Sequence, residues 1–254
     1  MSKACEAVVV VVQARMTSSR FPGKIMQPLA GSPLVRRTVE RAARIKGVDR
    51  IVVALAEGKA HDAAMAAFDG LGVDVVRGDE HDVLARTAAA ARAASAGVVV
   101  RITSDCPLVD PRVSEAVLAA YMAAKGETLR YARTAFDEGF PLGFDTEVMD
   151  ASALYEADER ATDPYEREHV TPYIWRRPDQ YPSLILTGKP DRRAWRLVVD
   201  TEDDYRLVSA VYDAFYPANP EFGYAELCGL FAARPDLLCI NAHVKQNPYV
   251  GLHA

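Results

Sequence analysis

Ala7-Val-Val-Val-Val-Val12 is the stretch that decides the fold of this 254-residue chain. Five consecutive β-branched residues in an unbroken apolar run are typical of a strand buried on both faces of a parallel sheet. Apolar runs at 51–55, 73–76 and 98–102 are further strand candidates. We therefore expect these four segments to be strands of one parallel sheet.

Helical patterns alternate with these runs. Apolar residues recur at helical spacing from Leu34 to Ile45, and Gly47 closes that helix. Residues 60–68 and the Ala-rich segment 82–95 are also expected to be helical, and Pro111 is expected at the first position of another helix. The regular alternation from residue 7 to about residue 125 indicates a doubly wound, Rossmann-like α/β fold with a mostly parallel sheet.

After about residue 125 the regular alternation ends, and the rest of the sequence indicates an α+β section followed by helices. In chain order, we expect strands at 129–134 and 144–149 around a turn at 139–143, helices at 151–159 and 164–176, a core strand at Trp195–Val199, and helices at 202–215 and 223–233.

No internal repeat and no long linker divides the sequence. We predict a single domain over residues 1–254, with 128–192 as an inserted section that serves the second substrate or a dimer contact. Residues 220–254 are predicted to form a C-terminal helical extension.

Charge and composition exclude several classes of protein. The chain has 30 Lys+Arg against 35 Asp+Glu, a formal net charge of -5, and 50% hydrophobic residues. This composition favours a folded protein, and the charge argues against a dedicated nucleic-acid binder.

No stretch approaches the length of a membrane span, and the apolar run at 7–12 is too short for a signal sequence, so we expect a cytoplasmic protein. The cysteines form no C-x-x-C pair and indicate neither a disulfide framework nor a zinc site: Cys5, Cys106, Cys228 and Cys239.

The loop after the first strand, residues 13–24, is rich in groups that bind phosphate. It supplies three cations and three hydroxyls, which a triphosphate needs for charge neutralisation and hydrogen bonding. It is not a Walker A loop, because Ser18 stands in place of the first Gly and Ile25 in place of Ser or Thr. A solvated basic loop is the alternative. The three cations of this loop are Arg15, Arg20 and Lys24, and its three hydroxyls belong to Thr17, Ser18 and Ser19.

Two carboxylates follow buried strands of the predicted sheet. Asp105 comes after the strand that ends at Ile102, and Asp200 after the expected strand 195–199. Facing each other across one cleft, they would make a Mg²⁺ site for nucleotidyl transfer, because Mg²⁺ takes one or two carboxylates and completes its shell with water and phosphate oxygens. The alternative for Asp105 is a cap or turn residue, which is the interpretation we favour for Asp110 and Thr201.

Besides the loop 13–24 and the segments that carry Asp105 and Asp200, a fourth region rich in polar side chains lies in the inserted section. Its side chains could recognise the second substrate, or they could form a solvated helix face and a subunit contact. They are Asp145, Glu147, Arg167, Glu168 and His169.

The chain closely resembles the CMP-sugar synthetases, which include the acylneuraminate and 3-deoxy-manno-octulosonate cytidylyltransferases. Taken together, its motifs are similar to the branch of spore-coat polysaccharide biosynthesis cytidylyltransferase-like proteins. The similarity runs from about residue 7 to residue 246 and rests on several linked motifs. In order, these are Val11–Lys24, Arg77–Arg86, Val100–Asp110, Gly143–Val148, Asp163–Pro172 and Val199–Asp203.

The resemblance implies a nucleotidyltransferase of the glycosyltransferase-A-like fold, often dimeric through the inserted section. It implies that Arg15, Lys24 and Asp105 are catalytic, that Asp105 and Asp200 hold Mg²⁺, and that the fourth region is an acceptor site or dimer contact. The acceptor-site motifs of true sugar-acid synthetases are not identifiable here. The residues expected to bind CTP are Ala14, Arg15, Ser19, Arg20, Lys24, Asp82, Arg101 and Ser104.

The function predicted from sequence is a Mg²⁺-dependent cytidylyltransferase. It would transfer CMP from CTP to an acidic sugar, phosphate or phosphonate acceptor, with release of pyrophosphate, to make precursors of surface polysaccharides or glycoconjugates. The expected assembly is a homodimer. The alternatives are a nucleotide-sugar-dependent glycosyltransferase and a catalytically silent nucleotide-binding subunit.

Overall fold

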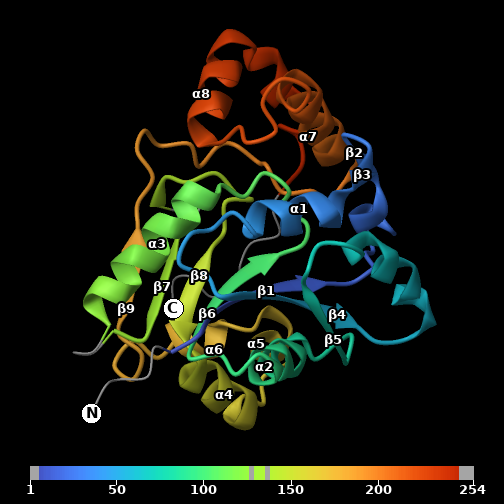
Figure 1. Ribbon diagram of the computed structural model, residues 1–254. Coiled ribbons are helices and arrows are strands. Elements are labelled where there is room, and N and C mark those ends of the chain that lie inside the picture. Colours follow the sequence, from blue (N-terminus) through green and yellow to red (C-terminus); the bar gives the residue numbers. More distant parts are fainter. Residues whose placement is uncertain (1–5, 126–128, 135–137, 246–254) are drawn as a thin grey trace.

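One seven-stranded sheet carries the fold in a computed structural model that describes residues 6–125, 129–134 and 138–245 (Figure 1). Cys5, residue 128 of the inserted section and residues 246–254 of the C-terminal extension lie outside this range. Strand β8 runs antiparallel to both of its neighbours and the other six strands are parallel, which confirms the mostly parallel α/β fold. Across the sheet the order is β5 (Asp74–Gly78), β4 (Arg50–Ala56), β1 (Val8–Ala14), β6 (Val98–Thr103), β8 (Glu147–Asp150), β7 (Tyr131–Thr134) and β9 (Ser183–Leu186).

The valine run builds two cores at once, because successive side chains of a strand point to opposite faces. Val8, Val10 and Val12 pack on the side of α1 (Leu34–Ala42) and α3 (Pro111–Ala124). Val9 and Val11 pack on the side of α2 (Val83–Ala93) and α4 (Ala151–Arg160). Helices therefore cover both faces of the sheet, as the unbroken apolar run predicts (Figure 1).

Several predicted helix ends are confirmed in detail. Pro111 occupies the first turn of α3, and the Asp110 carboxylate accepts the Arg112 N–H at 2.7 Å as its cap. Thr201 caps α7 (Glu202–Phe215) in a capping box with Asp204, and α8 spans Tyr224–Ala233. No helix within the described ranges is both long enough and apolar enough to cross a bilayer.

Three local expectations differ from the structure. Residues 59–68 form a 3₁₀ helix, η2 (Lys59–Phe68), in place of an α-helix. The helix expected over 164–176 is divided into α5 (Pro164–His169) and α6 (Pro172–Trp175), because Pro172 has no N–H to continue the ladder. The loop 13–33 also contains a short 3₁₀ helix, η1 (Lys24–Met26), and a hairpin of β2 (Pro28–Leu29) and β3 (Ser32–Pro33).

The prediction of a core strand at Trp195–Val199 is wrong. The segment is buried, but its backbone bonds to a turn and a loop instead of a neighbouring strand. Leu142 donates to the Trp195 carbonyl at 3.2 Å and Leu197 donates back to Leu142 at 2.8 Å, forming an isolated bridge. The strand that joins the sheet is β9, whose half-exposed sequence Ser-Leu-Ile-Leu contains an apolar run of only three residues.

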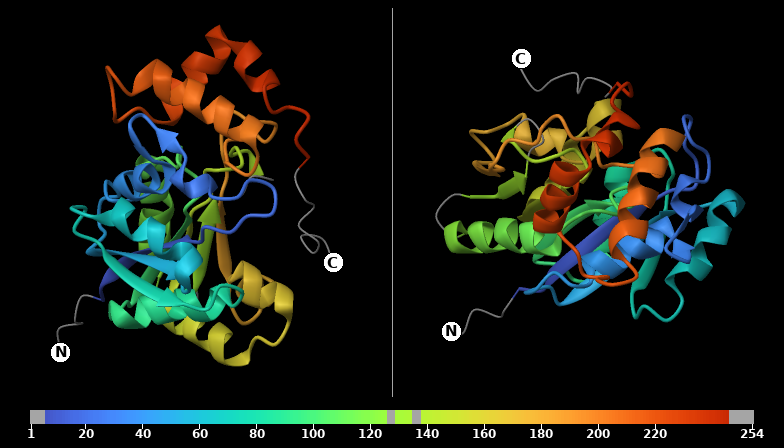
Figure 2. Two further views of the ribbon diagram at one scale, coloured as in Figure 1. Left: turned by 90° about the vertical axis from the view of Figure 1, so that its right-hand side faces the viewer. Right: turned by 90° about the horizontal axis from the view of Figure 1, so that it is seen from above.

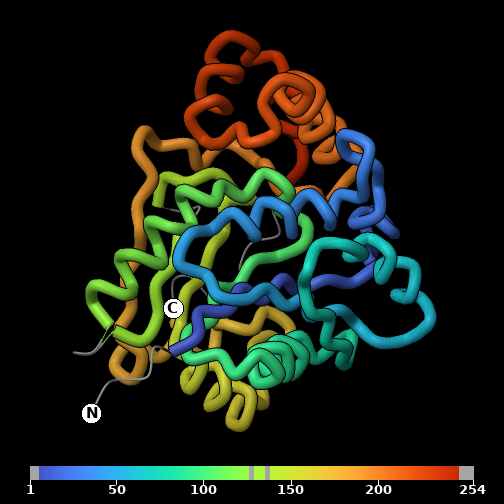
Figure 3. Tube along the Cα trace, viewed as in Figure 1, coloured from blue at the N-terminus to red at the C-terminus, as the bar shows by residue number. Residues whose placement is uncertain are grey.

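A third core joins the segment that follows β1 to the C-terminal helices. These helices pack over that segment, and the blue and orange parts of the chain meet there (Figures 2 and 3). The Arg41 guanidinium donates to the Phe222 carbonyl at 2.9 Å, and the Tyr205 hydroxyl donates to the Pro28 carbonyl at 2.5 Å. The inserted section contributes β7, β8 and β9 to the main sheet, while its limits at 128 and 192 and the single-domain description stay predictions.

Gly143 is expected to be intolerant of a side chain. Its φ is +103°, and an added Cβ would lie 2.6 Å from the Leu197 carbonyl carbon and 2.7 Å from its oxygen. Gly143→Ala should therefore lower the free energy of unfolding by about 2 kcal/mol or more, measured by urea denaturation. Gly229→Ala in α8 is the control, because nothing lies within 4 Å of that Cβ position. Equal stabilities of the two variants would contradict this account of the turn.

Candidate active site

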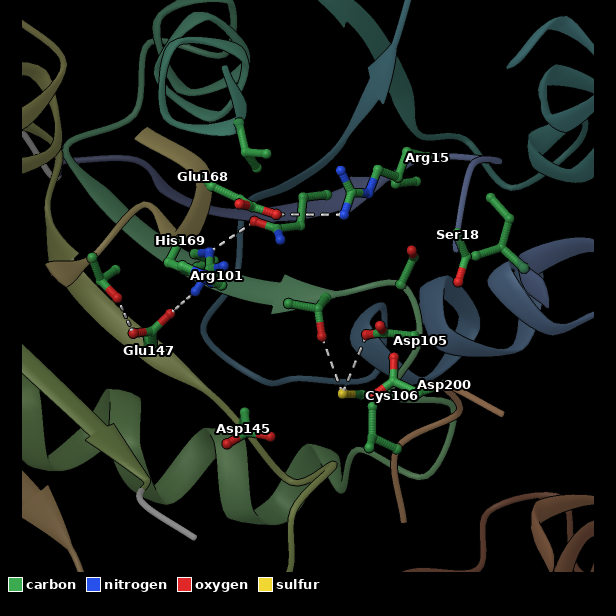
Figure 4. Close-up of a pocket in the computed structure, with 18 of the residues that line it drawn as sticks. Arg15, Ser18, Arg101, Asp105, Cys106, Asp145, Glu147, Glu168, His169 and Asp200 are labelled. Atoms are coloured by element: carbon green, nitrogen blue, oxygen red, sulfur yellow. Dashed lines mark hydrogen bonds and ion pairs between the residues drawn. The ribbon is translucent and has the colours of Figure 1, made fainter. Parts of the chain in front are cut away.

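A cavity of about 610 Å³ opens where the parallel strands end, which is where open α/β sheets bind ligands. Figure 4 shows Asp105, Cys106 and Asp200 gathered on one side of it, and Arg101, Glu147 and His169 on the other. The structure brings most of the sequence-predicted site residues together here. Those that line it are Ala14, Arg15, Ser19, Arg20, Lys24, Arg101, Ser104, Asp105, Asp145, Glu147, Glu168, His169 and Asp200.

The Lys24 ammonium lies between the two predicted metal ligands. Its Nζ is 2.7 Å from Asp105 Oδ2 and 2.8 Å from Asp200 Oδ1. Burial disfavours the charged ammonium, but the two carboxylates outweigh this effect and raise the pKa of Lys24 above its ordinary value. Lys24 is therefore a buried, fully charged cation that fixes the distance between the loop after β1 and both acidic segments.

Asp200 is held by two further cations. Arg20 Nη2 lies 2.9 Å and Arg196 Nη2 lies 2.8 Å from Asp200 Oδ2. Burial alone would raise the pKa of the Asp200 carboxyl, but Lys24, Arg20 and Arg196 together lower it. Arg196 was not identified from sequence, because it lies within an apolar segment and is buried against Asp204 at 2.9 Å.

The backbone explains why Asp105 and Asp200 meet although no strand precedes Asp200. Val199 donates its N–H to the Asp105 carbonyl at 2.9 Å, which fixes the two loops side by side. The Asp204 carboxylate also accepts the N–H groups of Asp200 and Thr201, at 3.1 and 3.0 Å. The loop geometry thus places Asp200 where a strand end was expected to place it.

This pair of carboxylates fits a hard divalent cation. Both present an oxygen to the same buried point, where the Lys24 ammonium now supplies the positive charge. Within residues 6–125, 129–134 and 138–245, no group of three or more His, Cys, Asp or Glu side chains is arranged to bind a metal. Two carboxylate oxygens are a donor set that Mg²⁺ commonly accepts from a protein, with its remaining positions taken by water or phosphate.

The loop after β1 is fastened by a buried histidine. His61 Nδ1 accepts the Met16 N–H at 3.0 Å, so its Nε2 carries the proton that faces Glu80 Oε2 at 3.2 Å. Glu80 also accepts a hydrogen bond from the Thr17 hydroxyl. His61 thus supports the loop by hydrogen bonding, a role that sequence spacing does not indicate.

At the other end of the cavity, Glu147 is the centre of a hydrogen-bond network. It forms an ion pair with Arg101 and accepts hydrogen bonds from the Tyr131 hydroxyl and, at 2.6 Å, from the Thr171 hydroxyl. Gln13 accepts from Arg101 Nε at 2.9 Å. Burial raises the pKa of Glu147, but Arg101 and the hydroxyls outweigh burial and lower it, so this carboxylate is ionised.

Asp145 differs from Glu147 in having no ion-pair partner among the described residues. One oxygen accepts the Gly143 N–H at 3.0 Å, and the side chain faces the cavity (Figure 4). Burial, with the negative charges of Glu147 and Asp105, raises the pKa of Asp145 to about 6. Asp145 therefore changes its charge close to neutral pH.

Asp82 and Arg167 do not line the cavity. Asp82 caps α2 by accepting the Ala85 N–H at 3.0 Å, and it also receives the Arg167 guanidinium at 2.5 Å. A second carboxylate, Asp158, holds Arg167 at 3.1 Å. The structure thus places Asp82, expected to bind CTP, and Arg167, expected in the acceptor region, in a contact between α2 and α5.

Sequence analysis missed several lining residues because their types are ordinary in helices and strands. Arg86 lies in the Ala-rich helix α2 and donates to the Ala54 carbonyl at 3.2 Å. His169, which sequence analysis did identify, also faces the cavity; burial and the nearby arginines lower its pKa, so its ring is neutral. The other missed residues with large side chains are Arg133, Tyr165 and Trp175.

The chain is similar to known cytidylyltransferases along most of its length. The model of the family described as "Cytidylyltransferase" matches residues 9–211. Spore coat polysaccharide biosynthesis protein SpsF of Bacillus subtilis is 32% identical over 236 residues, which is 90% of this chain and 95% of SpsF.

Solved structures share the fold. A cytidylyltransferase from Leptospira borgpetersenii superposes with a TM-score of 0.87 at 28% identity and covers 96% of this chain and 99% of its own. A CMP:2-keto-3-deoxy-manno-octonic acid synthetase complexed with CTP superposes with a TM-score of 0.61 at 17% identity, covering 82% and 99%. The second likeness shows the fold alone.

Asp145 should make stability depend on pH. Its folded pKa of about 6 lies above the ordinary 3.8, so the native state binds this proton more tightly than the unfolded chain. Stability from this group is therefore lost as pH rises from about 4 to about 6, and the loss persists above that range. Asp145→Asn should raise the unfolding temperature relative to wild type at about pH 7.5 but not at about pH 4.

The control for this experiment is Asp213→Asn, which changes an exposed carboxylate on α7. Its unfolding temperature should follow that of wild type at both pH values. An Asp145→Asn variant with the same difference from wild type at both pH values would show that this carboxyl does not titrate near neutrality in the folded protein.

Proposed function

The chain belongs to the cytidylyltransferase family, and on that premise we propose that it transfers CMP from CTP to an acidic sugar, phosphate or phosphonate acceptor with the help of Mg²⁺. Pyrophosphate is the second product. The similarity to SpsF supports a role in making precursors of surface polysaccharides or glycoconjugates.

The observation that carries this proposal is the cluster of Lys24, Asp105 and Asp200 beside the cationic loop. Nucleotidyl transfer requires positive charge around a polyphosphate and a site for a hard cation next to it. The loop supplies Arg15 and Arg20 as well as Lys24, and both acidic side chains lie within 2.8 Å of the Lys24 ammonium. We assign the metal to Asp105 and Asp200.

In the proposed reaction, an acceptor oxygen attacks the α-phosphorus of CTP, and the bond to the bridging oxygen of pyrophosphate breaks. Arg15, Arg20 and Lys24 would neutralise the charge that develops on the leaving β- and γ-phosphates. Ser19 and Ser104 would donate hydrogen bonds to the nucleotide. Mg²⁺, when bound, adds positive charge at the phosphate oxygens.

Asp145 would act on the acceptor. An attacking hydroxyl must lose its proton, and a carboxylate with a pKa of about 6 is largely ionised at neutral pH and able to accept it. An attacking phosphate oxygen would need no base, and Asp145 would then accept a hydrogen bond from another acceptor hydroxyl. Glu147, Glu168 and His169 would line the same part of the site.

The homodimer implied by the family resemblance stays part of the proposal. The inserted section would supply both the acceptor site and the contact between subunits.

Metal-dependent binding of CTP is the experiment that tests this function. With Mg²⁺, CTP at about 100 times its Kd should stabilise the wild-type protein by roughly 2.7 kcal/mol, which is a shift of several degrees in thermal unfolding. EDTA should reduce the shift. Asp105→Asn should abolish its metal dependence and lower kcat by about 100-fold or more, measured by pyrophosphate release.

The matched control is Asp213→Asn, which should bind CTP and release pyrophosphate as wild type does. UTP, ATP, GTP and UDP-glucose are tested in parallel. A shift with UDP-glucose and none with CTP would overturn the proposal in favour of glycosyl transfer. Binding of CTP without turnover of any acceptor class would favour a silent nucleotide-binding subunit.

A further inference from the structure

Arg133 brings an unneutralised positive charge into the cavity. It lies near the carboxyl end of β7 and lines the cavity, yet it forms no hydrogen bond, ion pair or ring contact with any residue in the described part of the chain. The other described cations of the cavity are engaged. Lys24 and Arg20 bind carboxylates, Arg101 binds Glu147, Arg15 lies 3.8 Å from Glu168, and Arg86 binds backbone carbonyls.

The strand register explains why Arg133 has no partner within the described ranges. Arg101 of β6 and Arg133 of β7 both pair with Glu147 of β8, so the three residues form one row across neighbouring strands. Paired residues point to the same face of a sheet. The row therefore carries two guanidinium groups and a single carboxylate.

Both oxygens of Glu147 are already used. Oε2 binds Arg101, and Oε1 accepts the hydroxyls of Tyr131 and Thr171. Glu147 is thus oriented toward Arg101 and Thr171 and does not bind Arg133, which no other described residue pairs with either. An arginine that a neighbouring carboxylate could neutralise, but does not, is suited to bind an anion from outside the protein.

The position of Arg133 separates it from the nucleotide-binding loop. The order β1-β6-β8-β7 places β7 three strands from β1. With strands about 4.8 Å apart, Arg133 lies about 14 Å across the sheet from the loop after β1, and about 10 Å from the strand that leads to Asp105. The charge therefore faces the part of the cavity where the acceptor, and not the triphosphate, would lie.

We propose that Arg133 binds the anionic group of the acceptor and selects acceptors that carry a carboxylate, phosphate or phosphonate. The inference rests on the function proposed above. A guanidinium can donate two parallel hydrogen bonds to any of these oxyanions, so Arg133 fixes the charge of the acceptor and its orientation toward the α-phosphorus.

The test measures acceptor binding apart from turnover. Wild type, Arg133→Gln, Arg133→Lys and the control Arg112→Gln are saturated with Mg²⁺ and α,β-methylene-CTP, which cannot transfer CMP. Arg112 is exposed on α3 and lies outside the cavity. Each protein is then titrated calorimetrically with 3-deoxy-manno-octulosonate, glucose 1-phosphate or 2-aminoethylphosphonate, with methyl glucoside as the uncharged probe.

We expect at least one oxyanion to bind the wild type and the Arg112→Gln variant equally. Arg133→Gln should weaken that binding by about 10- to 100-fold, and Arg133→Lys should weaken it less. Affinity for the CTP analogue should stay within about twofold of wild type in all variants. The probe that binds identifies whether the anion is a carboxylate, phosphate or phosphonate.

Equal oxyanion affinity in wild type and Arg133→Gln would overturn the inference and leave the proposed function standing. So would saturable binding of methyl glucoside with none of the three oxyanions, or a loss of CTP-analogue affinity in Arg133→Gln equal to its loss of oxyanion affinity. If the wild type does not bind the CTP analogue, the proposed function fails and the inference fails with it.

Discussion

A buried ammonium between two carboxylates is the interaction on which the site depends. Lys24 joins the loop after β1 to Asp105 and Asp200, which come from segments distant in sequence. Removing Lys24 would take from Asp105 the one ion-pair partner it has among the described residues, which is costly for a partly buried carboxylate. The same contact sets the position of the cationic loop, so one cluster of charges determines the geometry of the loop and of both carboxylates.

The direction of strand β8 in the sheet determines which side chains line the other end of the cavity. Because β8 is antiparallel and lies between two parallel strands, its first residue, Glu147, lies at the same edge as the carboxyl ends of β6 and β7. The section after residue 128 therefore contributes cavity-lining side chains from strands that belong to the main sheet. The cavity therefore has two regions of different charge. In one, Lys24 and nearby arginines neutralise Asp105 and Asp200; in the other, Arg133 has no ion-pair partner among the described residues.

Sequence reasoning succeeded where the signal was local. The valine run predicted a strand buried on both faces, and the cations and hydroxyls of the loop after it marked the cavity correctly. It failed where a residue's role depends on distant partners. Trp195–Val199 has the composition of a strand but bonds to a turn, whereas β9 is a strand whose apolar run is only three residues long. Arg133 and Arg196 are ordinary arginines in sequence, and they acquire meaning only from strand register and burial. Asp82 and Arg167 lie within recognisable motifs but pair with each other outside the cavity.

The most direct test of the account is a crystal structure with CTP and Mn²⁺, measured for anomalous scattering at the manganese edge. If these two carboxylates hold the metal, an anomalous peak will lie between Asp105 and Asp200, and the Lys24 ammonium will have moved from that position toward the CTP phosphates. CTP bound in the cavity with manganese elsewhere, and with Lys24 still between the two carboxylates, would contradict it.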